Sequence, residues 1–395
     1  MKRLSYILKS SQFIYDVYFF VMSALLKILG LFVGLDENLI LFNSYGGKKY
    51  DDSPKAIYEW MLSDHRFDNC KLVWALQEPD KVIIPGRAEV VKSDSFKYFV
   101  MALKAKVWVT NSSMERGLDF KKKKTICFNT WHGTAIKVMG IDIKDENQAF
   151  KSRVLVRADI MTAQSQYDID TFSHCFQLPV GSFRMTGSPR NDVLANYTMA
   201  DAEAIKKKLN IKKNKIVLLY APTFREYTKG SSNEVVLNVP MDLKKWQETL
   251  GEKYVVLFRA HYEVAKLMRV DGYPMFVDVS TYPNLNDLMI ISDALISDYS
   301  SIYFDYSVMH KPMYCFAYDY DEYMSNRGMY LSLKDELPCI IHKDEDSLIK
   351  DLSDFESEKE LHIQRTMKFQ EEYVTEYGHG AENCCDVIAQ ELRIS

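Results

Sequence analysis

The amino-acid sequence predicts an α/β protein with two successive parallel β-sheets, and three observations support this fold class. Short apolar runs alternate with amphipathic stretches along most of the chain, a pattern typical of βαβ units in which helices connect parallel strands. The pattern occurs in two series of similar size, separated by a lysine-rich helical stretch at 201–209. The chain has 395 residues, which is enough for two domains that each bury their own core.

The apolar runs define the expected strands of each sheet. In the first series they are 39–42, 72–76, 89–91, 106–109, 125–128 and 160–163. In the second series they are 215–220, 254–258, 275–279, 294–296 and 313–316. Two Rossmann-like domains that face each other across a central cleft constitute the GT-B architecture. We therefore expect an N-terminal domain over 37–200 and a C-terminal domain over 201–395, with the last long helix, 358–377, crossing back to the first domain.

Residues 1–36 are expected to form an amphipathic, membrane-associating helix. The apolar stretch 14–33 is long enough to span a bilayer, which takes about 20 residues. However, Asp16 and Lys27 lie inside it, on a helical face of mostly polar or small residues. This pattern favours a helix in the membrane interface, or one whose polar face packs on the protein, over an isolated span. The alternative is a core helix covered by the domain. The residues expected to contact the membrane are Phe13, Phe20, Leu25, Ile28, Leu31 and Phe32.

Charge, cysteine spacing and the absence of nucleotide-binding motifs exclude several classes of function. The net charge of -4 gives no global reason to expect nucleic-acid binding. The seven cysteines lack the spacing of metal ligands. Neither a phosphate-binding Gly-x-x-x-x-Gly-Lys loop nor a nicotinamide fingerprint occurs. We therefore expect a protein that needs neither a metal nor an organic cofactor.

Polar clusters follow three of the expected strands. His132 comes after the strand 125–128, Arg259 and His261 come after 254–258, and the polar segment 297–301 comes after 294–296. Because parallel strands end at the same edge of a sheet, such clusters mark the place where α/β proteins bind their ligands. A lone histidine in a loop more commonly has no functional role. Together, the three clusters indicate one active site.

These segments resemble the CDP-glycerol glycerophosphotransferase family, whose members prime and polymerise teichoic acids and related polymers. The landmarks, in the order of the family, are 42–48, 53–58, 131–134, 186–192, 220–225, 259–261 and 297–305. The resemblance extends from about residue 38 to about residue 382. The chain departs from the family pattern at 135–136 and at Tyr262, and neither departure removes a reactive group. It also departs at 337–340, where the resemblance implies less about the residues.

The resemblance implies a phosphoryl transfer in which an acceptor hydroxyl attacks the phosphorus next to glycerol in CDP-glycerol, and CMP leaves. Such catalysis depends on positioning, proton removal and stabilisation of charge on the phosphate oxygens. Because neutral histidine is a suitable base near neutral pH, His132 is expected to take the proton of the acceptor. His261 is expected to bind the pyrophosphate or to stabilise the departing CMP. The opposite assignment of the two histidines stays open.

The substrate-binding residues are expected at the strand ends. Ser300 and Ser301 precede an expected helix, 302–309, whose first amides and two hydroxyls can cradle a phosphate, although simple N-capping is the alternative. Asp298 and Asp305 are expected to hold a sugar or glycerol hydroxyl, or to orient the cradle, since carboxylates repel phosphate. The complete expected set is Gly133, Thr134, Lys137, Arg225, Arg259, Asp298, Ser300, Ser301 and Asp305.

The leading hypothesis is a transferase at the cytoplasmic face of the cell membrane, bound peripherally or monotopically. It would move glycerol phosphate from CDP-glycerol to a polyprenyl-diphosphate-linked saccharide, as a primase or short-chain polymerase. Three alternatives remain: CDP-ribitol as the donor, a GT-B glycosyltransferase or epimerase that uses a nucleotide sugar, and a non-catalytic membrane scaffold. The oligomeric state is left open.

Overall fold

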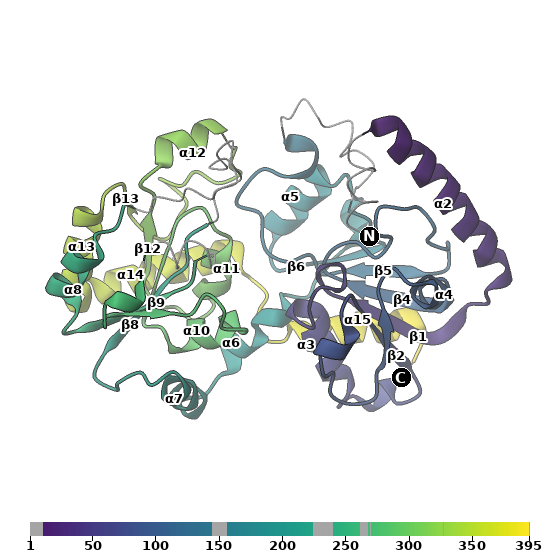
Figure 1. The fold of residues 1–395 in the computed structure, drawn as a ribbon, viewed down its shortest axis with the longest axis horizontal. Helices are drawn as coiled ribbons and strands as arrows, with labels where there is room; N and C mark the ends of the chain where they lie inside the picture. The colour runs from purple at the N-terminus through teal and green to yellow at the C-terminus, as the bar shows by residue number, and fades with distance from the viewer. Residues whose placement is uncertain are drawn as a thin grey trace. The chain divides into compact units, whose positions relative to one another are not determined.

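The computed structural model describes residues 11–143, 156–223, 240–260, 268, 270–326 and 328–394 (Figure 1). The chain divides into two compact units. Unit 1 comprises Met1–His132, Met139–Asp192 and His379–Ser395, and unit 2 comprises Gly133–Val138 and Val193–Gly378. Neither unit is therefore a single continuous stretch of sequence.

Unit 1 is built on a parallel seven-stranded sheet with the order β3-β2-β1-β4-β5-β6-β7. Its strands are β1 (Asp36–Asn43), β2 (Lys71–Leu76), β3 (Glu89–Lys92), β4 (Ala105–Thr110), β5 (Ile126–Asn129), β6 (Ile160–Ala163) and β7 (Phe183–Met185). The register places Leu41 beside Val73 on one side and beside Trp108 on the other. This is the strand order of a doubly wound Rossmann-like sheet, whose direction of progression reverses between β1 and β4.

Two apolar clusters cover the two faces of this sheet. Successive residues of a strand point to opposite faces. Accordingly, Phe42 belongs to the cluster under α3 (Asp52–Met61) and α15 (Gly380–Leu392), whereas Leu41 belongs to the cluster under α4 (Phe96–Lys104). Cys384 and Cys385 of α15 are fully buried in the first cluster. The last helix of the chain therefore contributes to the core of unit 1. Helix α5 (Gln166–Cys175) also belongs to this unit.

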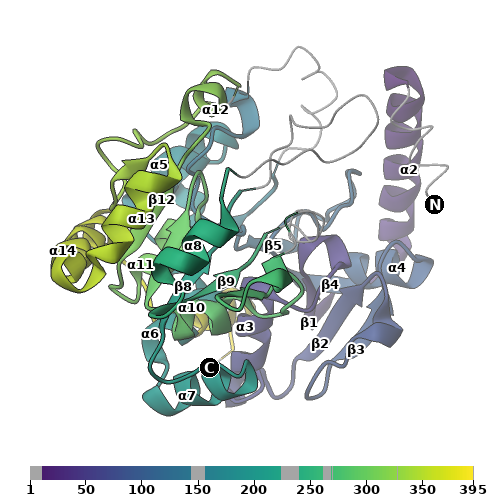
Figure 2. The same ribbon diagram turned by 60° about the vertical axis from the view of Figure 1, so that its left-hand side comes forward.

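Helix α2 (Gln12–Phe32) lies along the side of unit 1, near α4 (Figure 2). Leu26 joins the cluster under α4, the Ser23 hydroxyl accepts a hydrogen bond from the Asp119 amide at 3.0 Å, and Lys27 forms a 2.6 Å ion pair with the Asp119 carboxylate. The polar face of α2 thus faces the protein. Its expected membrane-contacting residues are exposed on the surface: Phe13, Phe20, Leu25, Ile28, Leu31 and Phe32. Among the described residues, α2 is the one helix long and apolar enough to cross a membrane.

Unit 2 contains a parallel six-stranded sheet with the order β10-β9-β8-β11-β12-β13, which repeats the doubly wound order of unit 1. Its strands are β8 (Ile216–Tyr220), β9 (Tyr254–Phe258), β10 (Phe276–Asp278), β11 (Ala294–Ser297), β12 (Met313–Phe316) and β13 (Ile341–His342). Its helices are α6 (Asp192–Asn196), which begins at the last residue of unit 1, α7 (Met199–Lys208), α8 (Leu243–Leu250), α10 (Leu285–Ile291), α11 (Ile302–Ser307), α12 (Tyr320–Asn326), α13 (Glu345–Ser353) and α14 (Phe355–Tyr373). The predicted fold class, two Rossmann-like parallel sheets, is confirmed.

The chain passes between the two units at places that the pattern of strands did not predict. Residues 133–138 leave unit 1 directly after His132 and pair with 328–330 of unit 2: the Val138 amide donates to the Gly328 carbonyl at 3.0 Å. The long helix expected at 358–377 corresponds to α14, which belongs to unit 2. The following helix, α15, is the one that packs on unit 1.

Candidate active site

In unit 1, three residues that follow strands β1, β4 and β5 are joined by hydrogen bonds. The Tyr45 amide donates to the Asn111 side-chain oxygen at 2.8 Å, and Nδ1 of His132 lies 2.8 Å from the Asn111 backbone carbonyl. These strands flank the point where the order of the sheet reverses, between β1 and β4. Ligands of open α/β sheets bind at the carboxyl ends of the strands at this point. His132 is therefore placed where the topology favours a binding site.

The hydrogen bond to Asn111 determines which nitrogen of His132 is available for chemistry. A carbonyl oxygen can only accept, so Nδ1 carries the proton and Nε2 has the free lone pair of the neutral imidazole. In the described part of the chain, Nε2 makes no hydrogen bond. The Trp131 ring lies 4.1 Å from the imidazole between centroids and is tilted by 31° against it, and Trp131 has a left-handed backbone (φ 51°) that turns the chain here. The outer edge of His132 is solvent-exposed, but the surrounding protein atoms desolvate the ring and lower its pKa below 6.5.

A buried ion pair lies beside His132 and was not predicted from the sequence. Asp52, at the start of α3, accepts hydrogen bonds from the Tyr45 hydroxyl at 2.5 Å and from Arg190 at 3.2 Å. The side chains of Asp52 and Arg190 are 5% and 14% exposed. Burial alone would raise the pKa of Asp52, but Arg190 and the Tyr45 hydroxyl outweigh this effect and hold it below its usual value. The charge of Asp52 raises the pKa of His132, and the charge of Arg190 lowers it.

In unit 2, Asp298 connects the ends of the two central strands. Its carboxylate oxygens accept hydrogen bonds from the Thr223 amide at 2.9 and 3.1 Å, and one of them also accepts from the Tyr299 amide at 2.6 Å. Thr223 follows β8 and Asp298 follows β11, so these bonds cross the point where this sheet reverses its order. Arg259, after β9, donates to the backbone carbonyls of Val279 and Tyr282 at 3.2 and 2.7 Å. Both side chains thus support the loops at this edge.

The two serines before α11 have the geometry of a local cap. The Ser300 hydroxyl accepts a hydrogen bond from the Ile302 amide at 3.3 Å, and Ser301 makes no side-chain capping bond. The Ser300 bond is a local contact two residues along the chain, and the N-cap residue itself is Ser301. Asp305 lies inside α11 and is 7% exposed.

The remaining expected residues divide between unit 2 and the part of the chain outside the described residues. Gly133, Thr134 and Lys137 belong to unit 2, where Thr134 is buried and the Lys137 ammonium lies 5.4 Å from the centroid of the Tyr323 ring. His261 and Arg225 lie outside the described residues. Within the described ranges, no group of three or more histidine, cysteine, aspartate or glutamate side chains could hold a metal ion.

Comparisons with known proteins agree on one family. The family model described as CDP-glycerol:poly(glycerophosphate) glycerophosphotransferase matches residues 25–390. The teichoic acid glycerol-phosphate transferase of Staphylococcus aureus is 34% identical over 370 residues, which cover 89% of this chain and 93% of that protein.

The teichoic acid poly(glycerol phosphate) polymerase of Staphylococcus epidermidis is 32% identical over 368 residues, covering 90% of this chain and 51% of the polymerase. The chain therefore spans about half the length of that relative. A solved structure of the wall teichoic acid polymerase TagF superposes with a TM-score of 0.85 at 30% identity, covering 94% of this chain and 93% of that structure.

Proposed function

The chain belongs to the CDP-glycerol:poly(glycerophosphate) glycerophosphotransferase family and is thus a transferase, and we propose that it moves glycerol phosphate from CDP-glycerol to a teichoic acid precursor. The proposed acceptor is a hydroxyl of a polyprenyl-diphosphate-linked saccharide, and the proposed leaving group is CMP. The observation that most supports this proposal is the state of His132, which is a neutral imidazole with a free Nε2 at the strand ends of unit 1.

In the proposed reaction, Nε2 of His132 removes the proton of the acceptor hydroxyl as its oxygen attacks the phosphorus next to glycerol. The bond between this phosphorus and the bridging oxygen breaks, and that oxygen leaves with CMP. The proton on Nδ1 stays hydrogen-bonded to the Asn111 carbonyl, which keeps the ring oriented while Nε2 gains its proton. The nearby charge of Asp52 stabilises the imidazolium that forms. General-base catalysis of this kind typically contributes about 10²- to 10⁴-fold to the rate.

The donor is proposed to bind unit 2 through its strand-end residues. Arg259 and Lys137 supply positive charge for the pyrophosphate, and Asp298 acts as a positioning residue because its carboxylate holds the Thr223 amide. His261 is proposed to bind the pyrophosphate or to donate a hydrogen bond to the departing CMP. The full proposed set is Gly133, Thr134, Lys137, Arg225, Arg259, Asp298, Ser300, Ser301 and Asp305.

Helix α2 is proposed to hold the enzyme at the cytoplasmic surface of the membrane. Its exposed apolar face includes Leu31 and Phe32, each 82% exposed, while Ser23 and Lys27 bond to unit 1. A helix with this division of surfaces lies in the membrane interface with its apolar face among the acyl chains. A lipid-linked acceptor would be presented at the same surface.

The test is release of CMP from CDP-glycerol, with CDP-ribitol and UDP-sugars assayed in parallel. The acceptor is a synthetic lipid-linked disaccharide, with and without one glycerol phosphate unit. CMP release that is lost in His132→Ala, but kept in the control variant of the exposed His65, His65→Ala, supports the proposal. Turnover of CDP-ribitol alone would change the donor, and turnover of a UDP-sugar alone would reject the proposed reaction. Full activity of His132→Ala would reject its role as the base.

A further inference from the structure

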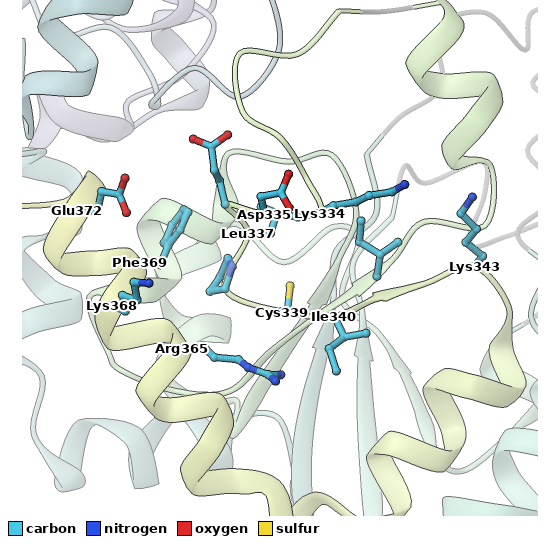
Figure 3. Close-up of a pocket in the computed structure, with 13 residues that line it drawn as sticks. Lys334, Asp335, Leu337, Cys339, Ile340, Lys343, Arg365, Lys368, Phe369 and Glu372 are labelled. Carbon is cyan, nitrogen blue, oxygen red and sulfur yellow. The ribbon is translucent and has the colours of Figure 1, made fainter.

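Unit 2 contains a cavity of about 780 Å³ that none of the expected substrate-binding residues lines (Figure 3). One wall is the segment 334–341, which leads into β13, and the other is the C-terminal half of α14. Its volume is within the range of about 300–1,000 Å³ that is usual for small-molecule sites. Its apolar walls include Leu337, Pro338 and Phe369.

Basic side chains enter the lining from both walls. Arg365 and Lys368 come from α14, Lys334 comes from the opposite segment, and Lys343 follows β13 (Figure 3). The guanidinium nitrogen Nη1 of Arg365 is buried and, among the described residues, has no hydrogen-bond partner. A buried donor without a partner costs about 1–3 kcal/mol, and more when it is charged. An anion bound in the cavity that Arg365 lines would supply negative charge close to this guanidinium.

The carboxylates in the lining are bonded to neighbouring donors other than these cations. Glu336 accepts hydrogen bonds from the Tyr373 hydroxyl at 2.8 Å and from the Ser332 amide at 2.5 Å. Asp335 accepts from the Ser332 hydroxyl at 2.6 Å. Glu372 lies at the far end of α14 and is exposed. Among the described residues, none of the acidic residues of the lining forms an ion pair with Arg365.

We infer that this cavity binds a phosphate group through Arg365 and Lys368. Guanidinium groups match the oxygens of a phosphate in geometry, and an ammonium adds a second positive charge. If the proposed function holds, the phosphate is a phosphodiester of the glycerol phosphate chain, and the cavity is an acceptor-chain site in addition to the catalytic one. The same chemistry would also recognise a free phosphate ion.

Calorimetric titration of the full chain with a synthetic glycerol phosphate trimer and, separately, with inorganic phosphate tests the inference. We expect Arg365→Met to weaken trimer binding at least about tenfold, because it removes a charge-assisted hydrogen bond. Lys359→Met is the matched control, since Lys359 is exposed on the same helix and lies outside the cavity. The melting temperature of ligand-free Arg365→Met should not fall, because a cation without a partner is removed.

Trimer binding that depends on Arg365, with inorganic phosphate at least tenfold weaker, identifies the polymer chain as the ligand. If Arg365→Met weakens the binding of inorganic phosphate as much as the binding of the trimer, the cavity is a phosphate site for a small anion. Equal affinities of Arg365→Met and the unaltered chain for both ligands, or no binding of either, would overturn the inference. CMP release is measured in parallel with acceptors that carry and that lack one glycerol phosphate unit. Its absence with both acceptors would reject the proposed function and leave the phosphate titration interpretable.

Discussion

Replacing Asp52 with asparagine tests the buried ion pair beside His132. The variant keeps the shape and an accepting oxygen, and asparagine tolerates the positive φ of 64° at this position. At 3.2 Å, opposite charges attract by about 5 kcal/mol if the effective dielectric constant is about 20. Removing one partner of a buried pair costs about 3–5 kcal/mol, because the other charge stays buried. We therefore expect Asp52→Asn to lower the free energy of unfolding by about 3–5 kcal/mol at pH 7.

The effect should depend on pH with a definite sign. The pKa of Asp52 is lower in the folded protein than its ordinary value of 3.8, so its contribution to stability is fully present above that value. It is lost as the pH falls through the folded-state pKa, and the difference between the variant and the unaltered chain should narrow below about pH 4. Because Asp52 raises the pKa of His132, the variant should also shift the acid limb of CMP release to lower pH. Arg190→Met should shift this limb to higher pH.

The assay is urea unfolding followed by tryptophan fluorescence, at pH 7 and at pH 3.5. Asp51→Asn is the control: Asp51 caps the same helix and has no ion pair in the described part of the chain, and asparagine caps equally well. The double variant Asp52→Asn with Arg190→Met should recover part of the loss, because no buried charge is left alone. Equal stabilities of the Asp51 and Asp52 variants, or a loss that persists unchanged in acid, would refute the reasoning.

Three further predictions concern other parts of the chain. The rate of CMP release should fall as the pH drops through the pKa of His132, which lies below 6.5. The same fall of the rate at low pH in His132→Gln would contradict this prediction. Serine substitutions at Leu31 and Phe32 should each weaken binding to anionic lipid vesicles by about 1.5–3 kcal/mol, because each removes an exposed apolar side chain of α2. Binding is measured by co-sedimentation, with Trp60→Ser as the control. If the Leu31 and Phe32 variants bind as strongly as the control, α2 is excluded as the membrane contact. Burial lowers the pKa of Lys311 to about 8, so the free energy of unfolding should rise by about 3 kcal/mol between pH 8 and 10.5 in the unaltered chain. The Lys311→Met variant should not show this rise. The same dependence on pH in both proteins would contradict the prediction.

The strands were predictable where a buried parallel strand is an apolar run. Strands β6, β9 and β12 have the bounds expected from the sequence. Strands β7 and β13 were missed because they are short: β7 has arginine at its centre, and β13 contains two residues. Each pairs with a neighbouring strand at the end of its sheet, which is a property of the tertiary structure and not of the local sequence.

The site was predictable to the extent that it depends on strand ends. The position of His132 after β5 followed from the apolar run before it. The role of Asp52 could not be predicted, because its partner Arg190 is 138 positions away and no spacing rule connects the two. Ser300 illustrates another limit: the same sequence fits a phosphate cradle and a local cap, and the hydrogen bond from the Ile302 amide to Ser300 is compatible with both.

The position of α15 in the core of unit 1 has a consequence for the order of events on the ribosome. Ile57 of α3 packs with Cys384 and Cys385, so the apolar face of α3 lacks its cover until a residue 328 positions further along the chain has been translated. The Gly380 and Ala381 amides, which bond to Asp192 at 2.7 Å, arrive equally late. Domains usually fold from the N-terminus as they emerge. Here the unit whose translation starts first is the last to be completed, so a premature stop near residue 378 would damage unit 1 more than unit 2.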